Sequence, residues 1–397
     1  MKQIILSIIV FLVISETVFS QENGINKPFK NVEFGGYLSS VQSAIAFDNN
    51  KDFLMIDNLI HNRLNFHWYG LSGLSASVQF RNRLLYGDQI RMGEFTSAEA
   101  VDSDRGYLDM AWNLATGNSF VLNSTIDRAW LGYARNNFDL TLGRQRINWG
   151  QSFVWNTNDI FNAYSFFDSD YPERPGSDAL RIQYYPGYTS TVEIAAKLDE
   201  HEKVTAAMLG RVNIGNYDVQ VLLGVLDQED YTLGFGWTGN IKGMSFTGEG
   251  NYLHPVENAR ETSGIFLLST GGGYTFDNSL HIQVEGLYSR FDKRTVSGFA
   301  GYYSTPLSVK NLAFTELSLF AQASYPITPL FNASMALMYY PEIDGYYAGP
   351  SIDYNLGDNL TLTFFIQSFG GKFIIPGTTI RQKQELSIGF LRFKINF

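Results

Sequence analysis

The last seven residues, Leu391-Arg392-Phe393-Lys394-Ile395-Asn396-Phe397, alternate strictly between apolar and polar side chains. Successive side chains of an extended strand point to opposite faces, so the apolar residues of this stretch share one face and the polar residues the other. The last residues of a soluble domain are usually polar and frayed. A strand with one lipid-facing surface, one wet surface and two paired edges instead fits a closed sheet in a membrane. A half-buried edge strand of a soluble sandwich is the alternative interpretation.

The composition favours many aromatic strands joined by tight turns. Aromatic residues make up 15% of the 397 residues, glycine occurs 37 times, and charged residues contribute only 17%. Tyr and Phe are enriched in strands and glycine in turns. The net charge of −10 argues against a nucleic-acid partner. The absence of cysteine excludes disulfides, thiolate metal sites, thiol catalysis and a lipoprotein anchor.

Residues 1–20 have the pattern of a cleaved signal peptide. Lys2 supplies a short basic region, and residues 4–14 form an apolar core of eleven residues. Val18 and Ser20 suit the positions before a cleavage site, so we expect cleavage before Gln21. No later apolar run is long enough for a transmembrane helix, which needs about 18 residues or more. The remaining chain, residues 21–397, reads as one domain that could enter a membrane only as a β-barrel.

Segments of about ten residues with alternating character recur along the chain, as expected for an antiparallel, up-and-down transmembrane β-barrel. We predict eighteen strands, with sixteen as the alternative count: 32–46, 60–69, 74–85, 126–135, 138–148, 179–185, 190–198, 203–214, 217–227, 230–241, 244–254, 264–276, 280–290, 314–326, 330–340, 348–356, 360–370 and 384–397.

The predicted connections alternate in length. Every second one is a tight turn, at 71–73, 136–137, 186–189, 215–216, 242–243, 277–279, 327–329 and 357–359. The long connections all fall in the other set, which is the asymmetry between the two rims of an outer-membrane barrel. Tyr and Trp also cluster at strand ends, where interfacial girdles would lie, in the pairs Trp68-Tyr69, Tyr184-Tyr185, Tyr339-Tyr340 and Tyr346-Tyr347.

The polar faces of these strands carry unevenly distributed charges. Strand alternation turns basic side chains toward the lumen at Arg63, Arg81, Arg83, Arg128 and Arg181, and the closing strand adds Arg392 and Lys394. A bulge at Gly143 would add Arg144 and Arg146. Later strands present Glu193, Glu249, Glu285, Glu316 and Asp353. A basic arc facing an acidic arc would create a transverse field that orients dipolar solutes. Alternatively, these charges only pair with one another and keep the lumen wet.

The loop at residues 149–178 is a candidate constriction. It carries the acidic residues Asp159, Asp168, Asp170 and Glu173, together with the Phe166-Phe167 pair. A loop of this length and apolar content is not expected to float freely. Folding into the barrel would bury its aromatic residues and bring its carboxylates against the arginines. The alternative is a lid packed over the outer rim.

Two stretches resemble a known family. Arg128-Ala129-Trp130, followed by Leu142-Gly143-Arg144-Gln145-Arg146-Ile147-Asn148-Trp149-Gly150, is similar to the G-R-Q … W-G region of Gram-negative porin-like barrels, including the alginate-export-like family and a related uncharacterised one. The aromatic closing strand also resembles that of outer-membrane barrels. The resemblance covers residues 126–185 and implies an outer-membrane channel with an arginine-rich pore and an inward-folded loop. Arginine is less dense here than in dedicated polyanion exporters.

Enzyme chemistry has little support in the sequence. The five histidines are far apart without metal-ligand spacing, and no Gly-x-Ser-x-Gly motif occurs. We therefore expect no catalysis, cofactor or metal. The sequence predicts a channel in the outer-membrane lipid for passive diffusion of small hydrophilic or anionic solutes, as a monomer or a homotrimer. The alternative function is a plugged barrel whose long loops, residues 86–125 and 291–313, bind a surface partner.

Overall fold

The computed structural model describes residues 31–47, 50–93, 97–168, 171, 173–257, 259, 261–290, 307–313, 315–374 and 380–397. The predicted signal peptide, Asp170 and most of the predicted outer loop at 291–313 lie outside the described residues.

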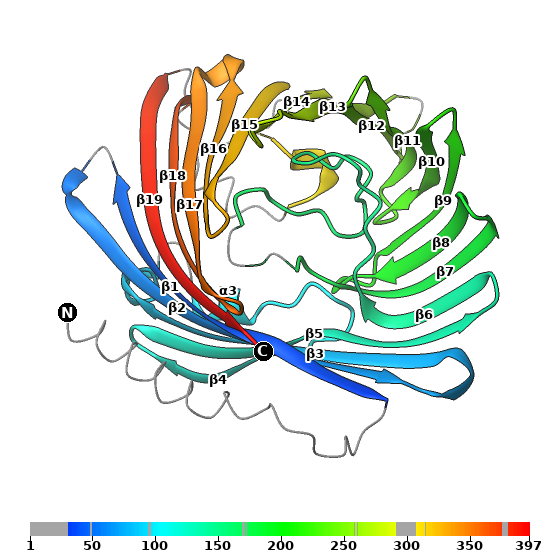
Figure 1. Ribbon diagram of the computed structural model, residues 1–397, viewed down its shortest axis with the longest axis horizontal. Helices are drawn as coiled ribbons and strands as arrows, with labels where there is room; N and C mark the ends of the chain where they lie inside the picture. The colour runs from blue at the N-terminus through cyan, green and yellow to red at the C-terminus, as the bar shows by residue number, and fades with distance from the viewer. Residues whose placement is uncertain are drawn as a thin grey trace.

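The described residues form a single antiparallel sheet, eighteen strands of which close into a barrel (Figure 1). The strands are β1 (Val32–Phe47), β2 (Asn50–Tyr69), β3 (Leu74–Gly87), β4 (Ala111–Gly117), β5 (Phe120–Arg135), β6 (Phe138–Gln145), β7 (Ser177–Gly187), β8 (Ser190–Leu198), β9 (Val204–Ile214), β10 (Tyr217–Leu226), β11 (Asp230–Ile241), β12 (Met244–Pro255), β13 (Ile265–Thr275), β14 (His281–Arg290), β15 (Leu317–Thr328), β16 (Phe331–Tyr340), β17 (Gly345–Gly357), β18 (Leu360–Ile374) and β19 (Arg381–Asn396). Among the described strands, β4 pairs only with β5, and it is not one of the barrel strands.

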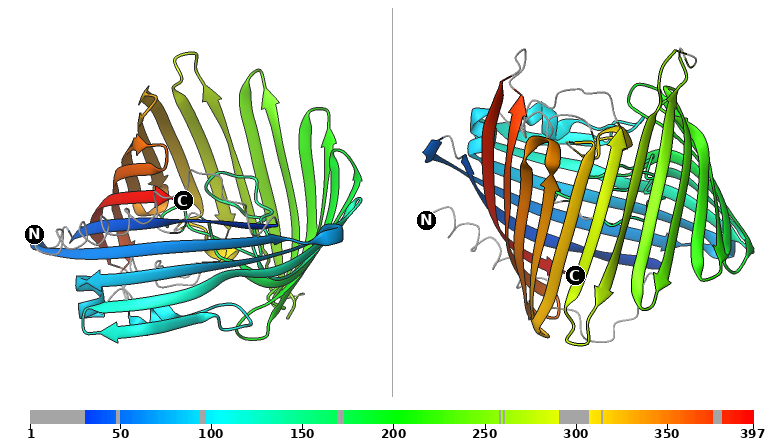
Figure 2. Two further views of the ribbon diagram at one scale, coloured as in Figure 1. Left: turned by 60° about the horizontal axis from the view of Figure 1, so that its bottom comes forward. Right: turned by 90° about the horizontal axis from the view of Figure 1, so that it is seen from above.

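The barrel closes where the last strand pairs with the first. Tyr37 of β1 lies opposite Asn396 of β19, and the ladder continues to Phe47 and Leu386. Beyond it, Gly36 and Phe397 exchange two backbone hydrogen bonds of 2.9 and 3.0 Å. No strand edge is thereby left unpaired at the seam, which a sheet in hydrocarbon requires. The tilt of the strands around the barrel is visible in Figure 2.

The two faces of the wall differ as strand alternation predicts. Along β11, Tyr231, Leu233 and Phe235 are exposed on the outer face, whereas Asp230 and Thr232 are buried on the inner face. The closing strand follows the same pattern, with Leu391 exposed outward. Exposed apolar side chains on most strands give the barrel an outer surface suited to lipid tails.

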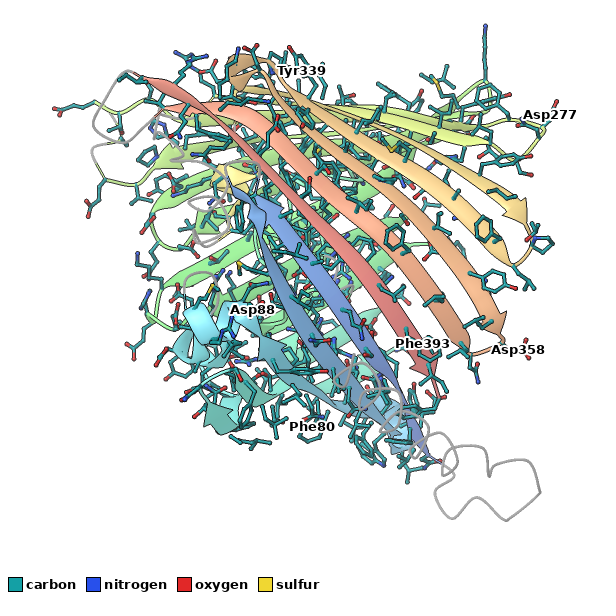
Figure 3. All side chains as sticks on the ribbon, turned by 90° about the vertical axis from the view of Figure 1, so that its left-hand side faces the viewer. Phe80, Asp88, Asp277, Tyr339, Asp358 and Phe393 are labelled. Atoms are coloured by element: carbon teal, nitrogen blue, oxygen red, sulfur yellow. The ribbon has the colours of Figure 1, made fainter. Side chains whose placement is uncertain are left out.

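The connections also sort by rim as predicted. The short turns, such as those at Asp277 and Asp358, lie at the rim where the chain ends, and Asp88 and Tyr339 lie toward the other (Figure 3). The long connections β3–β5, β6–β7 and β14–β15 all leave from that second rim. The predicted strand count of eighteen is confirmed.

Two of the four predicted aromatic pairs at strand ends are only half correct as girdles. Tyr339 and Tyr346 are exposed on the outer face, but their neighbours Tyr340 and Tyr347 are buried inside the barrel. Because adjacent residues of a strand face opposite ways, one member of each such pair must point inward.

The largest departure from the predicted elements lies near the outer rim. Strand β2 begins at Asn50, ten residues earlier than predicted, and the segment predicted as a loop at 86–125 contains α2 (Asp88–Met92), α3 (Ala98–Asp102), β4 and the first part of β5. The strand extensions there contain consecutive apolar residues, at 53–56 and 120–122, beside Asn, Asp and Ser, so strict apolar–polar alternation does not detect them. Within the described part of the chain, no helix has the length and apolarity needed to span a membrane.

Candidate functional site: the loop inside the barrel

The connection between β6 and β7, residues 146–176, lies inside the ring of strands (Figure 1). Its aromatic residues Trp149, Trp155, Phe161 and Phe167 are buried. A segment of this length buried without regular secondary structure must find partners for its backbone polar groups elsewhere. Those partners come from the inner faces of the strands.

Three glutamates of the barrel wall hold the loop through its N–H groups. Glu285 on β14 accepts hydrogen bonds from the backbone of Phe153 at 2.8 Å and Trp155 at 2.7 Å, as well as Val154. Glu249 accepts one from the Gln151 backbone at 3.0 Å. These bonds are of the stronger, charge-assisted kind when the carboxylates are ionised. Two of the carboxylates predicted as an acidic pore wall, Glu249 and Glu285, therefore anchor the loop.

Glu193 on β8 also anchors the loop, but it binds a side chain of the loop instead of the backbone. Its carboxylate accepts a hydrogen bond of 2.5 Å from Trp149 Nε1 and is paired with Arg181 at 2.7 Å. The predicted pore-lining residue Arg181 thus lies beneath the loop and braces one of its anchors.

Side-chain amides complete the attachment on several strands. Gln220 on β10 donates to the carbonyl of Trp149 at 2.8 Å, Asn251 on β12 to that of Thr157 at 3.0 Å, and Gln367 on β18 to that of Phe167 at 3.1 Å. In the other direction, Asn158 of the loop donates to the carbonyl of Phe235 on β11 at 2.9 Å. The loop is therefore fixed to much of the barrel circumference.

Apolar packing accompanies these bonds in two clusters. One forms around Trp155 and Phe167 of the loop with inward side chains of β14 to β18, including Phe320, Tyr347 and Phe369. The other forms around Trp149, Ile160 and Phe161 with inward side chains of β7 to β13. Burying an aromatic or large aliphatic side chain contributes about 1.5–3 kcal/mol. The loop consequently forms the apolar core of the barrel.

The end of the loop is held by β1, β3 and β5. Arg128 donates to the carbonyls of Glu173 at 3.0 Å and Arg174 at 2.5 Å. The carboxylate of Glu173 accepts a hydrogen bond from the Tyr37 hydroxyl at 3.1 Å, and the guanidinium of Arg81 lies 3.9 Å from the centre of the Tyr171 ring. The expected contact between the loop and the arginines is present, mainly through backbone and aromatic groups.

Several of the predicted arginines form ion pairs with carboxylates of the wall. Arg63 and Arg128 both pair with Asp127, at 2.5 and 3.0 Å. Arg144 pairs with Asp104 at 2.5 Å and Asp178 at 2.7 Å.

The sequence pattern does not predict the carboxylate partners of these arginines, which are Asp127, Asp104 and Asp178. The β3–β5 ladder shifts register between Gln79 and Phe80, so that Asp127 and Arg128, although adjacent in sequence, are both buried in the wall. Strict alternation turns only one of two neighbouring residues inward.

Gly143 turns Arg144 inward by a different route from the predicted one. The bulge prediction is wrong, because the described β5–β6 and β6–β7 ladders both pass through Gly143 without a register shift. Gly143 instead has a φ of +114°, a conformation that glycine adopts readily. Arg144, the next residue, is buried and lines a cavity beside the loop.

That cavity, of about 490 Å³, lies between the loop, the 103–106 segment and the wall. Basic side chains on its surface are Arg81, Arg83, Arg105, Arg144, Arg174 and Lys197, and acidic ones are Asp104, Asp127, Asp168, Asp178 and Asp227. The contacts that hold Arg174 and Lys197 are with uncharged groups: the Tyr164 ring, 3.0 Å away, and the carbonyl of Phe161, 3.0 Å away. Neither residue was predicted, since one is in the loop and the other at the end of β8.

Asp159 is the acidic residue of the loop that the structure buries most deeply. Burial raises the pKa of its carboxyl to about 7, while Arg146, Arg174 and Lys197 act in the opposite direction. Of the other predicted acidic residues, Asp168 is exposed to the cavity and Glu173 faces β1. Among the described residues, no group of three or more His, Asp or Glu side chains is placed to hold a metal ion.

Several solved structures have a similar architecture. The chain is similar to OccAB4 of Acinetobacter baumannii (TM-score 0.57, 9% identity, 94% of this chain and 100% of that one) and to the outer membrane protein OpdK of Pseudomonas aeruginosa (TM-score 0.57, 7% identity, 92% and 99%). OccK11 (OpdR) of P. aeruginosa has a TM-score of 0.55 at 9% identity, with 93% and 97% covered. The fold is that of the outer-membrane porins. No model of a known protein family and no curated protein matches the sequence.

Proposed function

We propose that the protein is exported through its N-terminal signal peptide and forms an outer-membrane channel for small hydrophilic or anionic solutes. The observation that carries this proposal is the polar cavity of about 490 Å³ that remains beside the inward loop. A loop that narrows a barrel while leaving a charged, hydrated space supports selection by size and charge. The porin fold of the structural neighbours supports the same function.

Charge selection would depend on the basic side chains whose positive charge is least neutralised by nearby carboxylates. Arg63, Arg128, Arg144 and Arg181 are each paired with a carboxylate, so their contribution to the pore potential is reduced. Arg174 and Lys197 line the cavity and contact uncharged groups. We therefore assign the larger share of anion attraction to these two residues, with Arg81, Arg83 and Arg146 contributing.

The proposed selectivity can be measured as the reversal potential of single channels in a planar bilayer with a salt gradient. Wild-type protein should favour anions, and Arg174→Glu and Lys197→Glu should each shift the reversal potential toward cations. Lys242→Glu, in an exposed turn of the opposite rim, is the matched control and should leave it unchanged. Equal potentials in all four proteins would refute the assignment.

The extent of the loop's attachment also favours a second function. Contacts to β1, β5, β8, β10, β11, β12, β14 and β18 would suit a plug in a closed barrel whose outer loops bind a partner. Such a barrel would insert into a bilayer and pass no current, whereas the channel passes ions. Neither function requires catalysis or a cofactor.

A further inference from the structure

Most large apolar side chains on the inner wall are covered by the loop, but one group is not. Leu209, Leu222, Leu253, Leu267 and Leu287 on the inner faces of β9 to β14 are fully buried. By contrast, the side chains of Val41, Leu59, Leu85, Ile90, Phe365 and Phe390 remain partly exposed and line a pocket of about 150 Å³. The pocket belongs to the wall made by β1, β2, β3, β18 and β19, with α2 at its edge.

Strand register shows that this pocket opens from the lumen side of the wall. Val41 lies opposite Leu59 on one side and Arg392 on the other, and Ser43 lies opposite Asp57 and Phe390. The same face of β1 carries Tyr37, which contacts the inward loop. Residues paired across strands share a face, so the pocket residues point inward like Tyr37.

Two stacked phenylalanines line one side of the pocket. The rings of Phe365 and Phe390 are stacked, with centroids 4.4 Å apart and planes 12° apart. The guanidinium of Arg392 lies 5.9 Å from the centre of the Phe365 ring. An exposed aromatic surface of this kind in a wet lumen favours contact with another flat ring.

One carboxylate oxygen at the pocket receives no hydrogen bond from the part of the chain that the structure describes. Asp57 Oδ1 accepts a hydrogen bond from the Gln89 backbone at 2.8 Å, whereas Oδ2 is buried and has no hydrogen-bond partner among the described residues. Leaving a buried acceptor unsatisfied costs about 1–3 kcal/mol, more if the group is charged. A donor supplied by a bound molecule would remove that cost.

We propose that this pocket is a binding subsite for small solutes that combine one apolar ring with a hydrogen-bond donor, as aromatic alcohols and amines do. The ring would lie against Phe365 and Phe390, and the donor would reach Asp57 Oδ2. A cavity of about 150 Å³ is large enough for one benzene-sized ring. The subsite rests on the proposed channel function. It adds to that function a class of solute that would bind transiently inside the channel.

Binding can be tested with refolded protein in lipid nanodiscs by saturation-transfer NMR, with benzyl alcohol as the probe. Benzyl methyl ether, which has the ring and lacks the donor, should bind more weakly. Val41→Phe fills the pocket and should weaken benzyl alcohol binding at least about tenfold, the effect of losing about 1.4 kcal/mol. Val221→Phe, the same change on the lipid-facing side of β10, controls for probe held in the lipid.

Asp57→Asn replaces the acceptor with an amide and should weaken benzyl alcohol binding several-fold without changing ether binding. Circular dichroism and the heat-dependent gel mobility of barrels would verify that each variant has folded. Equal binding by wild-type protein, Val41→Phe and Val221→Phe would overturn the subsite. Because this assay requires no conduction, a silent channel and an empty pocket are distinguishable failures.

Discussion

The carboxylate of Glu285 on β14 accepts a hydrogen bond of 2.7 Å from the backbone N–H of Trp155, 130 residues earlier in the chain. The same carboxylate accepts the N–H groups of Phe153 and Val154 and the hydroxyl of Ser269. One acidic side chain thus closes a turn of the inward loop against the barrel wall. This contact explains why a glutamate occupies an otherwise well-packed inner face.

Glu285→Gln should loosen the inward loop without opening the barrel. The amide keeps one acceptor oxygen but loses the charge, so the anchor should weaken by about 2 kcal/mol. Tryptophan fluorescence should report greater solvent access around Trp155, and single-channel recordings should show more frequent current fluctuations. Glu202→Gln, in an exposed turn, is the control. Identical recordings from both variants would show that Glu285 does not hold the loop.

Asp127→Asn should destabilise the barrel strongly. Asp127 is the carboxylate shared by Arg63 and Arg128, and all three are buried. Removing it leaves two buried guanidinium groups without their counter-charge, which typically costs about 3–5 kcal/mol. The free energy of unfolding in urea, measured with the barrel in vesicles, should fall by that order. Asp218→Asn on an exposed site of β10 should change it by less than about 0.5 kcal/mol.

The inward position of the loop should depend on pH through Asp159, which belongs to the loop and not to a spanning strand. Its folded pKa of about 7 lies above the ordinary value of 3.8. A carboxyl group whose pKa is higher in the folded state than in the unfolded state contributes stability at low pH. This contribution is complete below the unfolded-state pKa and is lost as the pH rises through the folded-state pKa. The loop should therefore become less stable between about pH 4 and pH 8, by a few kcal/mol.

Asp159→Asn should reduce this pH dependence, since an amide does not titrate. The midpoint of urea-induced exposure of the loop tryptophans, measured at both pH values, provides the comparison. A wild-type midpoint that rises with pH would have the wrong sign for this mechanism.

Gly143→Ala should also be costly. Gly143 has a φ of +114°, and an added Cβ would overlap the carbonyl oxygen of Ala129 on the paired strand. Backbone strain of this kind costs about 1–3 kcal/mol, before the overlap is counted. Gly389→Ala is a suitable control because nothing lies within 4 Å of its added Cβ. Comparable urea unfolding curves for the two variants would argue against strain at Gly143.

The sequence predicted the parts of the fold that depend on periodicity and turn length. The closing strand at Arg392 and Phe393, the count of eighteen strands and the sorting of connections by rim all follow from two-residue alternation and short turns. Alternation is a property of each strand by itself, imposed by lipid outside the barrel and water inside it. It can therefore be recognised in the sequence without knowing which strands are neighbours.

The side-chain contacts of the site could not be predicted from alternation and turn length. Alternation placed Arg128 correctly but missed Asp127, because a register shift in the ladder turns both inward. Glu249 and Glu285 were assigned to the lumen, yet their role as loop anchors depends on which loop residues reach them. The ion pair of Arg144 with Asp104 joins strand β6 to the connection before β4, 40 residues away in the sequence, and only the folded barrel brings them together.

The most direct test of the central claim compares single-channel conductance of the wild-type barrel with that of a variant in which residues 151–168 are replaced by a short Gly-Ser linker. If the loop narrows an open pore, wild-type protein conducts in small steps and the shortened variant in larger ones with weaker anion preference. A wild-type barrel that inserts and stays silent, while the shortened variant conducts, would contradict this account and identify the loop as a plug.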